Sequence, residues 1–136
     1  MTRSGELNDS DLVSQFEALA IAPGHFGHHE HVRLAYAMLA DLGDFGEAAV
    51  RYRRALRAFA GHVGAAGKYH ETLTWAYLAL VHERMASHPY ASSHAFVVAN
   101  PDLLDHKNGA LARYYDVAAI TASPLARRVF VLPLPR

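Results

Sequence analysis

Apolar side chains recur every three or four positions over most of the chain, and this spacing places them on one side of an α-helix. The pattern predicts four long helices, over 10–21, 28–42, 45–64 and 69–87. Shorter helices are expected over 93–99 and 110–115, with single turns at 102–105 and 124–128. No segment ahead of the tail alternates apolar and polar residues as a half-buried strand does. We therefore predict an all-α protein.

Capping residues and helix breakers support these boundaries. Residues 8–10 are good N-caps for the first helix, Gly43 suits a left-handed C-terminal cap, and Asp44 suits the next N-cap. The tail 129–135 is apolar and contains two prolines, which bar it from the middle of a sheet. We expect one domain over 1–136: a bundle of four main helices, short C-terminal helices, and an extended proline-containing tail that packs across them.

Composition narrows the functional class. The chain has no cysteine, which removes disulfides, iron–sulfur clusters and thiolate metal sites. Thirteen basic and 13 acidic residues give a formal net charge of zero, which argues against a nucleic-acid partner. No apolar run is long enough to span a membrane, and the N-terminus lacks a signal-peptide pattern. We expect a cytoplasmic protein without a membrane partner, and the excess of arginine over lysine suggests a bacterial source.

Three histidines stand within four residues where the 28–42 helix begins. His28 and His31 lie one turn apart, on the same side as the apolar positions of that helix. His29 falls on the opposite side together with Arg33 and Tyr36, and we expect that side to face water. Two imidazoles therefore point toward the core, either as half of a metal site or as hydrogen-bonded core groups.

The 69–87 helix carries a further candidate ligand, His70. His70 shares one face with Thr74, Tyr77 and Arg84 as well as with apolar residues. A purely structural helix would more often place aliphatic side chains at such positions. If this helix packs against the 28–42 helix through their apolar faces, His70 approaches His28 and His31.

These positions predict a metal site formed by His28, His31 and His70. Neutral imidazoles suit Fe, Cu or Zn, and three protein ligands leave open positions for water, substrate or dioxygen. Tyr77 and Arg84 are the candidate catalytic residues. Both share the face of His70, and Arg84 can hold a carboxylate or phosphate. The established motifs of zinc proteases, di-iron bundles and serine hydrolases are absent.

The predicted function is a metal-dependent enzyme that acts on a small molecule, either by oxidation with dioxygen or by water activation for hydrolysis or lyase chemistry. The alternative is a non-catalytic module that binds a small molecule or forms a homodimer, with structurally hydrogen-bonded core histidines. The sequence does not choose the substrate or the metal. It also leaves open whether Glu71, His25, His29 or His62 joins the site.

Two motifs resemble a small, uncharacterised bacterial family of helical proteins. The first is the run from Phe26 through His28 and His31 to Val32, and the second is Gly67-Lys68-Tyr69-His70-Glu71-Thr72. The segments 100–104 and 126–133 resemble the same family. The resemblance brings no activity or substrate. It singles out His28, His31 and His70 among the ten histidines.

Overall fold

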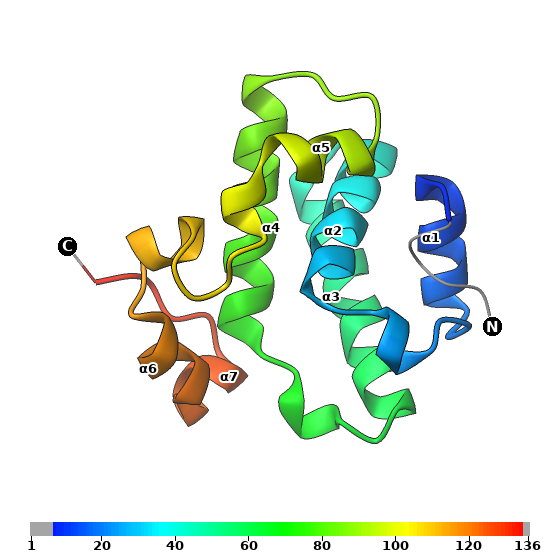
Figure 1. Cartoon of the computed structure of the whole chain (residues 1–136). Coiled ribbons are helices and arrows are strands. Elements are labelled where there is room, and N and C mark those ends of the chain that lie inside the picture. The colour runs from blue at the N-terminus through cyan, green and yellow to red at the C-terminus, as the bar shows by residue number, and fades with distance from the viewer. Residues whose placement is uncertain (1–6, 135–136) are drawn as a thin grey trace.

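The computed structural model describes residues 7–134, and all regular structure in that range is helical (Figure 1). The α-helices are α1 (Asp9–Glu17), α2 (His28–Leu42), α3 (Phe45–His62), α4 (Glu71–Ser87), α5 (Ser93–Ala99), α6 (Val117–Ala122) and α7 (Pro124–Arg128). Single 3-10 turns form η2 (Pro23–His25), η3 (Ala66–Lys68), η4 (Pro101–Leu103) and η5 (Ala110–Arg113). The predicted all-α class is confirmed, and α1 to α4 correspond to the four main helices expected.

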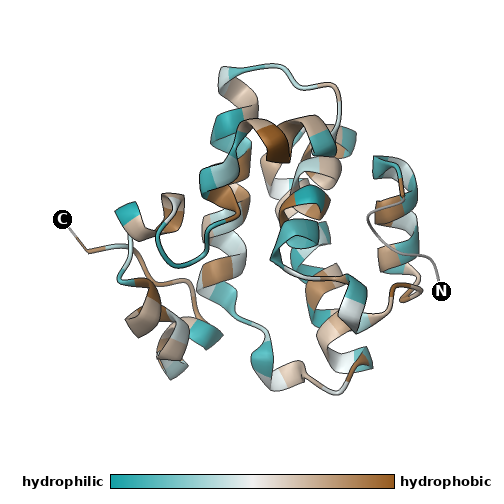
Figure 2. Ribbon diagram, viewed as in Figure 1, coloured by the Kyte–Doolittle hydropathy of each residue, from teal (hydrophilic) through white to brown (hydrophobic). Residues whose placement is uncertain are grey.

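Helix α2 is the centre of the fold. It packs against α1, α3, α4 and α5, and every residue from Val32 to Leu39 is buried (Figure 1). The other long helices keep a polar side, which gives them the mixed teal and brown colouring of Figure 2. Because α5 covers the side of α2 that the periodicity assigned to water, the prediction that Arg33 and Tyr36 face solvent is wrong.

Arg33 is completely buried and connects three segments of the chain. Its Nε donates a hydrogen bond to Ser93 Oγ at 2.8 Å, and a terminal nitrogen donates to the Leu7 carbonyl at 2.8 Å. The Asp9 carboxylate lies 3.6 Å from that nitrogen and also accepts hydrogen bonds from the hydroxyl and backbone N–H of Ser93. The guanidinium of α2 therefore joins the start of α1 to the start of α5.

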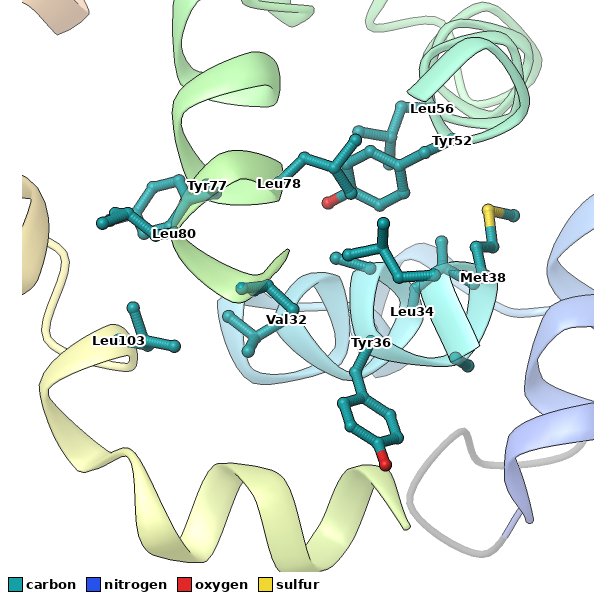
Figure 3. Packing of buried hydrophobic residues seen from close by; sticks show 14 of the residues in the cluster. Val32, Leu34, Tyr36, Met38, Tyr52, Leu56, Tyr77, Leu78, Leu80 and Leu103 are labelled. Atoms are coloured by element: carbon teal, nitrogen blue, oxygen red, sulfur yellow. The ribbon is translucent and has the colours of Figure 1, made fainter. Parts of the chain in front are cut away.

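Tyr36 extends from α2 toward α5 (Figure 3). Its hydroxyl donates to the Tyr90 carbonyl at 3.0 Å, and its ring centre lies 5.0 Å from that of Phe96. On another side of the core, Phe16 stacks on Phe26 and Phe59, with ring centres 4.3 and 4.9 Å apart. Aromatic contacts thus fasten α1 and α3 together beside the start of α2.

Helix ends differ from the predicted ones where local hydrogen bonding overrides the apolar period. Helix α1 ends at Glu17 rather than at 21, because the chain turns at Leu19, which has a positive φ of 60°. Helix α3 ends at His62 rather than at 64. Helix α4 begins at Glu71 rather than at 69, because His70 is its N-cap. The predicted caps Asn8, Asp44 and Gly43 are confirmed, and Gly43 has the left-handed φ of 69°.

The C-terminal part contains one helix that the apolar pattern did not predict. Helix α6 begins after Asp116, whose side chain accepts the backbone N–H of Ala119. The helix expected over 110–115 is instead the short η5 turn. None of the helices in the described part of the chain combines the length and apolarity needed to cross a lipid bilayer.

Thr72 attaches the C-terminal segment to α4. Its buried hydroxyl lies 2.8 Å from the carbonyl oxygens of both Ala126 and Val129 and accepts the backbone N–H of Val131 at 3.0 Å. Tyr115 donates to the Val131 carbonyl at 2.8 Å. The tail contacts the helices through its backbone as far as Val131, whereas the side chains of Val129, Phe130, Leu132 and Leu134 are exposed.

The substitution Arg33→Met is expected to lower the free energy of unfolding by about 3 kcal/mol, because it leaves Asp9, Ser93 and the Leu7 carbonyl without their buried donor. Urea denaturation measures this loss. The matched control is Arg54→Met on the exposed side of α3, where a change within about 0.5 kcal/mol is expected. Equal effects of the two substitutions would show that the buried network does not hold the three segments together.

The substitution Thr72→Val is expected to cost about 1–3 kcal/mol, because the buried polar groups of 126–131 lose their partner. Hydrogen exchange at Val131 should rise more than exchange in α2. The control is Thr121→Val, since the Thr121 hydroxyl is buried and has no hydrogen-bond partner within residues 7–134. That replacement is expected to be neutral or stabilising, and a destabilisation equal to that of Thr72→Val would contradict the assignment.

Candidate functional site

A cavity of about 550 Å³ lies among the first turns of α2, the C-terminal half of α3 and the N-terminal half of α4. Most of its wall is apolar. The apolar residues of the wall include Val32, Ala35, Leu56, Phe59, Ala60, Val63 and Leu73. Four histidines and Tyr77 also line it, and the histidines are His28, His31, His70 and His106. The structure therefore brings the three predicted metal ligands and one predicted catalytic residue to the same cavity.

The N-terminal ends of two helices, α2 and α4, place these side chains at the cavity. His28 is the first residue of α2, so His31 follows one turn later on the cavity side. Gly27 precedes them, and its backbone N–H donates to Glu30 Oε1 at 2.9 Å, which fixes the first turn. His70 stands immediately before α4, and Tyr77 lies about two turns further along that helix.

His28 has one ring nitrogen in use and one free. Its Nε2 donates to the Leu103 carbonyl at 2.8 Å, so the neutral ring carries its proton there and presents the lone pair of Nδ1. Burial lowers the pKa of His28, against the opposing effect of the Leu103 hydrogen bond. The imidazole is therefore a neutral hydrogen-bond acceptor at pH 7.

His31 is the polar side chain of the cavity wall that has no hydrogen bond to its ring within residues 7–134. The ring packs edge-on against Phe26, with the ring centres 4.5 Å apart. Burial lowers the pKa of His31 to about 4, with a further contribution from His28, while Glu30 acts in the opposite direction. Both ring nitrogens of this neutral imidazole are available to a molecule in the cavity.

Both ring nitrogens of His70 are occupied by the protein. Nδ1 accepts the backbone N–H of Leu73 at 3.1 Å, and Nε2 donates to the Ile120 carbonyl at 2.9 Å. The first bond caps α4 and the second attaches α6. His70 thus has the hydrogen-bonded structural role that the sequence offered as the alternative to metal ligation.

Tyr77 pairs with a histidine that the sequence did not single out. The Tyr77 hydroxyl lies 2.7 Å from His106 Nδ1, and the His28 ring centre lies 4.7 Å from that of Tyr77. Burial lowers the pKa of His106, and the neighbouring His28 and His70 lower it further. His106 lies in the loop between η4 and η5, where no helical period indicates which side chains converge.

Arg84 does not reach the cavity, which corrects its predicted place beside Tyr77. Its guanidinium forms two hydrogen bonds to Asp102, at 2.7 and 2.9 Å, and another to the Asn100 side chain at 2.9 Å. These bonds hold the η4 turn against α4, and η4 carries the Leu103 carbonyl that binds His28. Arg84 therefore positions the wall of the cavity and does not touch its interior.

The four residues that the sequence left undecided also lie outside the cavity wall. Glu71 accepts hydrogen bonds from Arg53 and Tyr69, which outweigh the effect of burial and leave the pKa of Glu71 lowered. His29 is exposed and contacts Glu30 at 2.7 Å. His25 and His62 do not line the cavity either.

Within residues 7–134, no three His, Asp or Glu side chains are arranged so that they could hold one metal ion. His70 would have to release Ile120 or Leu73 to bind the same ion as His28 and His31. No model of a protein family, curated protein or solved structure compared with the chain matches it.

Because His31 is neutral in the folded protein, the free energy of unfolding is expected to depend on pH. The unfolded chain takes up protons near pH 6.5, whereas folded His31 does so only near pH 4. The unfolded state therefore binds more protons between these values, and the free energy of unfolding is expected to fall as the pH is lowered from about 6.5 to 4.

The variant His31→Gln is expected to reduce this dependence by up to one proton, or about 1.4 kcal/mol per pH unit. Urea denaturation at several pH values from 7.5 to 4 measures the change. His88→Gln, at the exposed end of α4, is the control and should retain the wild-type slope. Superimposable profiles for wild type and His31→Gln would refute a buried neutral His31.

Proposed function

We propose that the chain binds a small organic molecule in the cavity between α2, α3 and α4, with His31 as the polar anchor. The observation that carries the proposal is an apolar cavity of about 550 Å³ that contains an imidazole, His31, with no hydrogen-bond partner among residues 7–134. This volume falls within the range of ligand pockets, which are mostly apolar with a few convergent polar groups. A ligand hydrogen bond to His31 would engage ring nitrogens that no described group of the protein occupies.

The polar groups of the cavity favour a ligand with both a donor and an acceptor. His31 offers a lone pair on one nitrogen and an N–H on the other, and His28 offers the lone pair of Nδ1. Tyr77 and His106 already satisfy each other at 2.7 Å and form a polar wall between these groups and the η4 turn. Acid–base chemistry on the bound molecule would pass through His31, because its nitrogens are free.

A second candidate is the metal-dependent enzyme expected from the sequence. The observation that favours it is the pair His28 and His31, one helical turn apart and both on the cavity wall, with free nitrogens. A Zn, Fe or Cu ion held there would recruit His70 only after its hydrogen bond to Ile120 or to Leu73 is broken. Metal binding is therefore expected to loosen either α6 or the first turn of α4, whereas binding of an organic ligand is not.

Binding of phenylacetate, phenylacetamide, hexanoate and indole, measured by calorimetry, tests the first proposal. The substitution Ala60→Phe fills the cavity from α3 and should weaken binding at least about tenfold. Ala58→Phe, on the exposed side of the same helix, is the matched control and should bind as wild type does. His31→Leu should lower affinity by about tenfold through the lost hydrogen bond.

If no probe binds, or if Ala60→Phe binds all of them unchanged, the cavity is not a ligand site. Titration of Zn(II), Fe(II) and Cu(II) into the chelated protein decides the second candidate. A stoichiometric ion that is lost in His28→Ala, His31→Ala and His70→Ala, and retained in His88→Ala, would favour the metal enzyme over the organic-ligand protein.

A further inference from the structure

The charged groups around the cavity are unevenly distributed. Lys68 lines its edge, and no Asp or Glu is found among the described residues of its wall. The Lys68 side chain is exposed and has no carboxylate within ion-pair distance in residues 7–134. The cavity edge therefore carries a positive charge that the described part of the protein does not neutralise.

The carboxylates of Glu30 and Glu71, which adjoin wall residues in the sequence, are occupied elsewhere. Glu71 accepts Arg53 Nε at 2.8 Å and the Tyr69 hydroxyl at 2.7 Å. Glu30 caps the start of α2 through the Gly27 N–H and contacts His29. Both carboxylates are thus paired with groups of their own, and neither is directed at Lys68.

Two helix N-termini lie at the cavity. Helices α2 and α4 both begin on its wall, at His28 and directly after His70. Each helix has a partial positive charge at this end, but Glu30 and Glu71 in their first turns offset it. The Arg57 guanidinium lies 5.8 Å from the ring centre of Tyr69, another wall residue. The positive charges of Lys68 and Arg57 disfavour a cationic ligand.

We propose that the ligand is a small carboxylic acid, bound as its anion with the apolar body in the cavity and the carboxylate at Lys68. This inference rests on the proposed ligand site and adds the chemical class of the ligand. A monoanionic carboxylate matches one ammonium group, whereas a phosphate ester usually requires several converging donors. His31 then binds a polar group on the body of the molecule, at the deeper part of the wall.

The test compares each acid with its own neutral amide. Calorimetry with phenylacetate and phenylacetamide, and with hexanoate and hexanamide, is expected to show acids binding at least about tenfold more tightly at low salt. Added salt should reduce this preference. Lys68→Gln should remove most of it, and Lys68→Glu should reverse it, while the affinity for the amides stays constant.

The control variant is Arg54→Gln, which removes one positive charge from α3 at a position outside the cavity wall. It should leave the preference for acids intact. If amides bind as tightly as acids, or if Lys68→Glu has no more effect than Arg54→Gln, the carboxylate assignment is overturned and the ligand site itself stands. Tighter binding of phenyl phosphate than of phenylacetate would also overturn it. Failure of every probe to bind would remove the proposed site together with its ligand class.

Discussion

The buried guanidinium of Arg33 is the interaction on which the arrangement of the helices depends. A charge in an apolar interior is tolerated only when it is paired and hydrogen-bonded, so its position restricts how the surrounding segments can lie. Arg33 meets this requirement with partners from the segment before α1, from α1 and from α5. Helix α2 can therefore be covered on the side that carries a charged residue, and it becomes the central element instead of a surface helix.

The fixed position of α2 explains why its first turn can carry free imidazoles. The buried segment from Val32 to Leu39 anchors the helix independently of the first turn, which carries His28 and His31. The loop behind them is held separately: Arg84 binds Asp102, and Gly109 approaches the Asp102 and Asp105 carbonyls so closely that a β-carbon would collide with both. This loop presents the Leu103 carbonyl to His28 and brings His106 to Tyr77. These contacts thus position the side of the cavity that carries His28, Tyr77 and His106.

The apolar period predicted the helices because amphipathic helices bury one face, and caps such as Asp44 and Gly43 refined their ends. It failed at Arg33 and Tyr36, where burial depends on α5, a helix 60 residues away from Arg33 in the chain. The apolar period also predicted that His28, His31 and His70 lie on facing sides of their helices, and all three line the cavity. It placed Arg84 wrongly and missed His106, since the partners of Arg84 and His106 itself lie in the irregular segment 100–109. Contacts made by loops have no period in the sequence.

The four cavity histidines differ in how many of their ring nitrogens are already hydrogen-bonded within the protein. This difference indicates which of them are structural and which could bind a ligand. An imidazole has two nitrogens, and both nitrogens of His70 are hydrogen-bonded within the protein. Its substitution would therefore remove the cap of α4 and the attachment of α6, whatever its effect on a ligand. His28 has one nitrogen bound to the Leu103 carbonyl, which fixes its tautomer, and His106 has one nitrogen bound to the Tyr77 hydroxyl, which can donate or accept. Only the ring of His31, among these four, has no bond to the described part of the chain. Its ring packs against Phe26 and lines the apolar cavity, so its two nitrogens are the ones that a bound molecule could engage without breaking a hydrogen bond of the described chain.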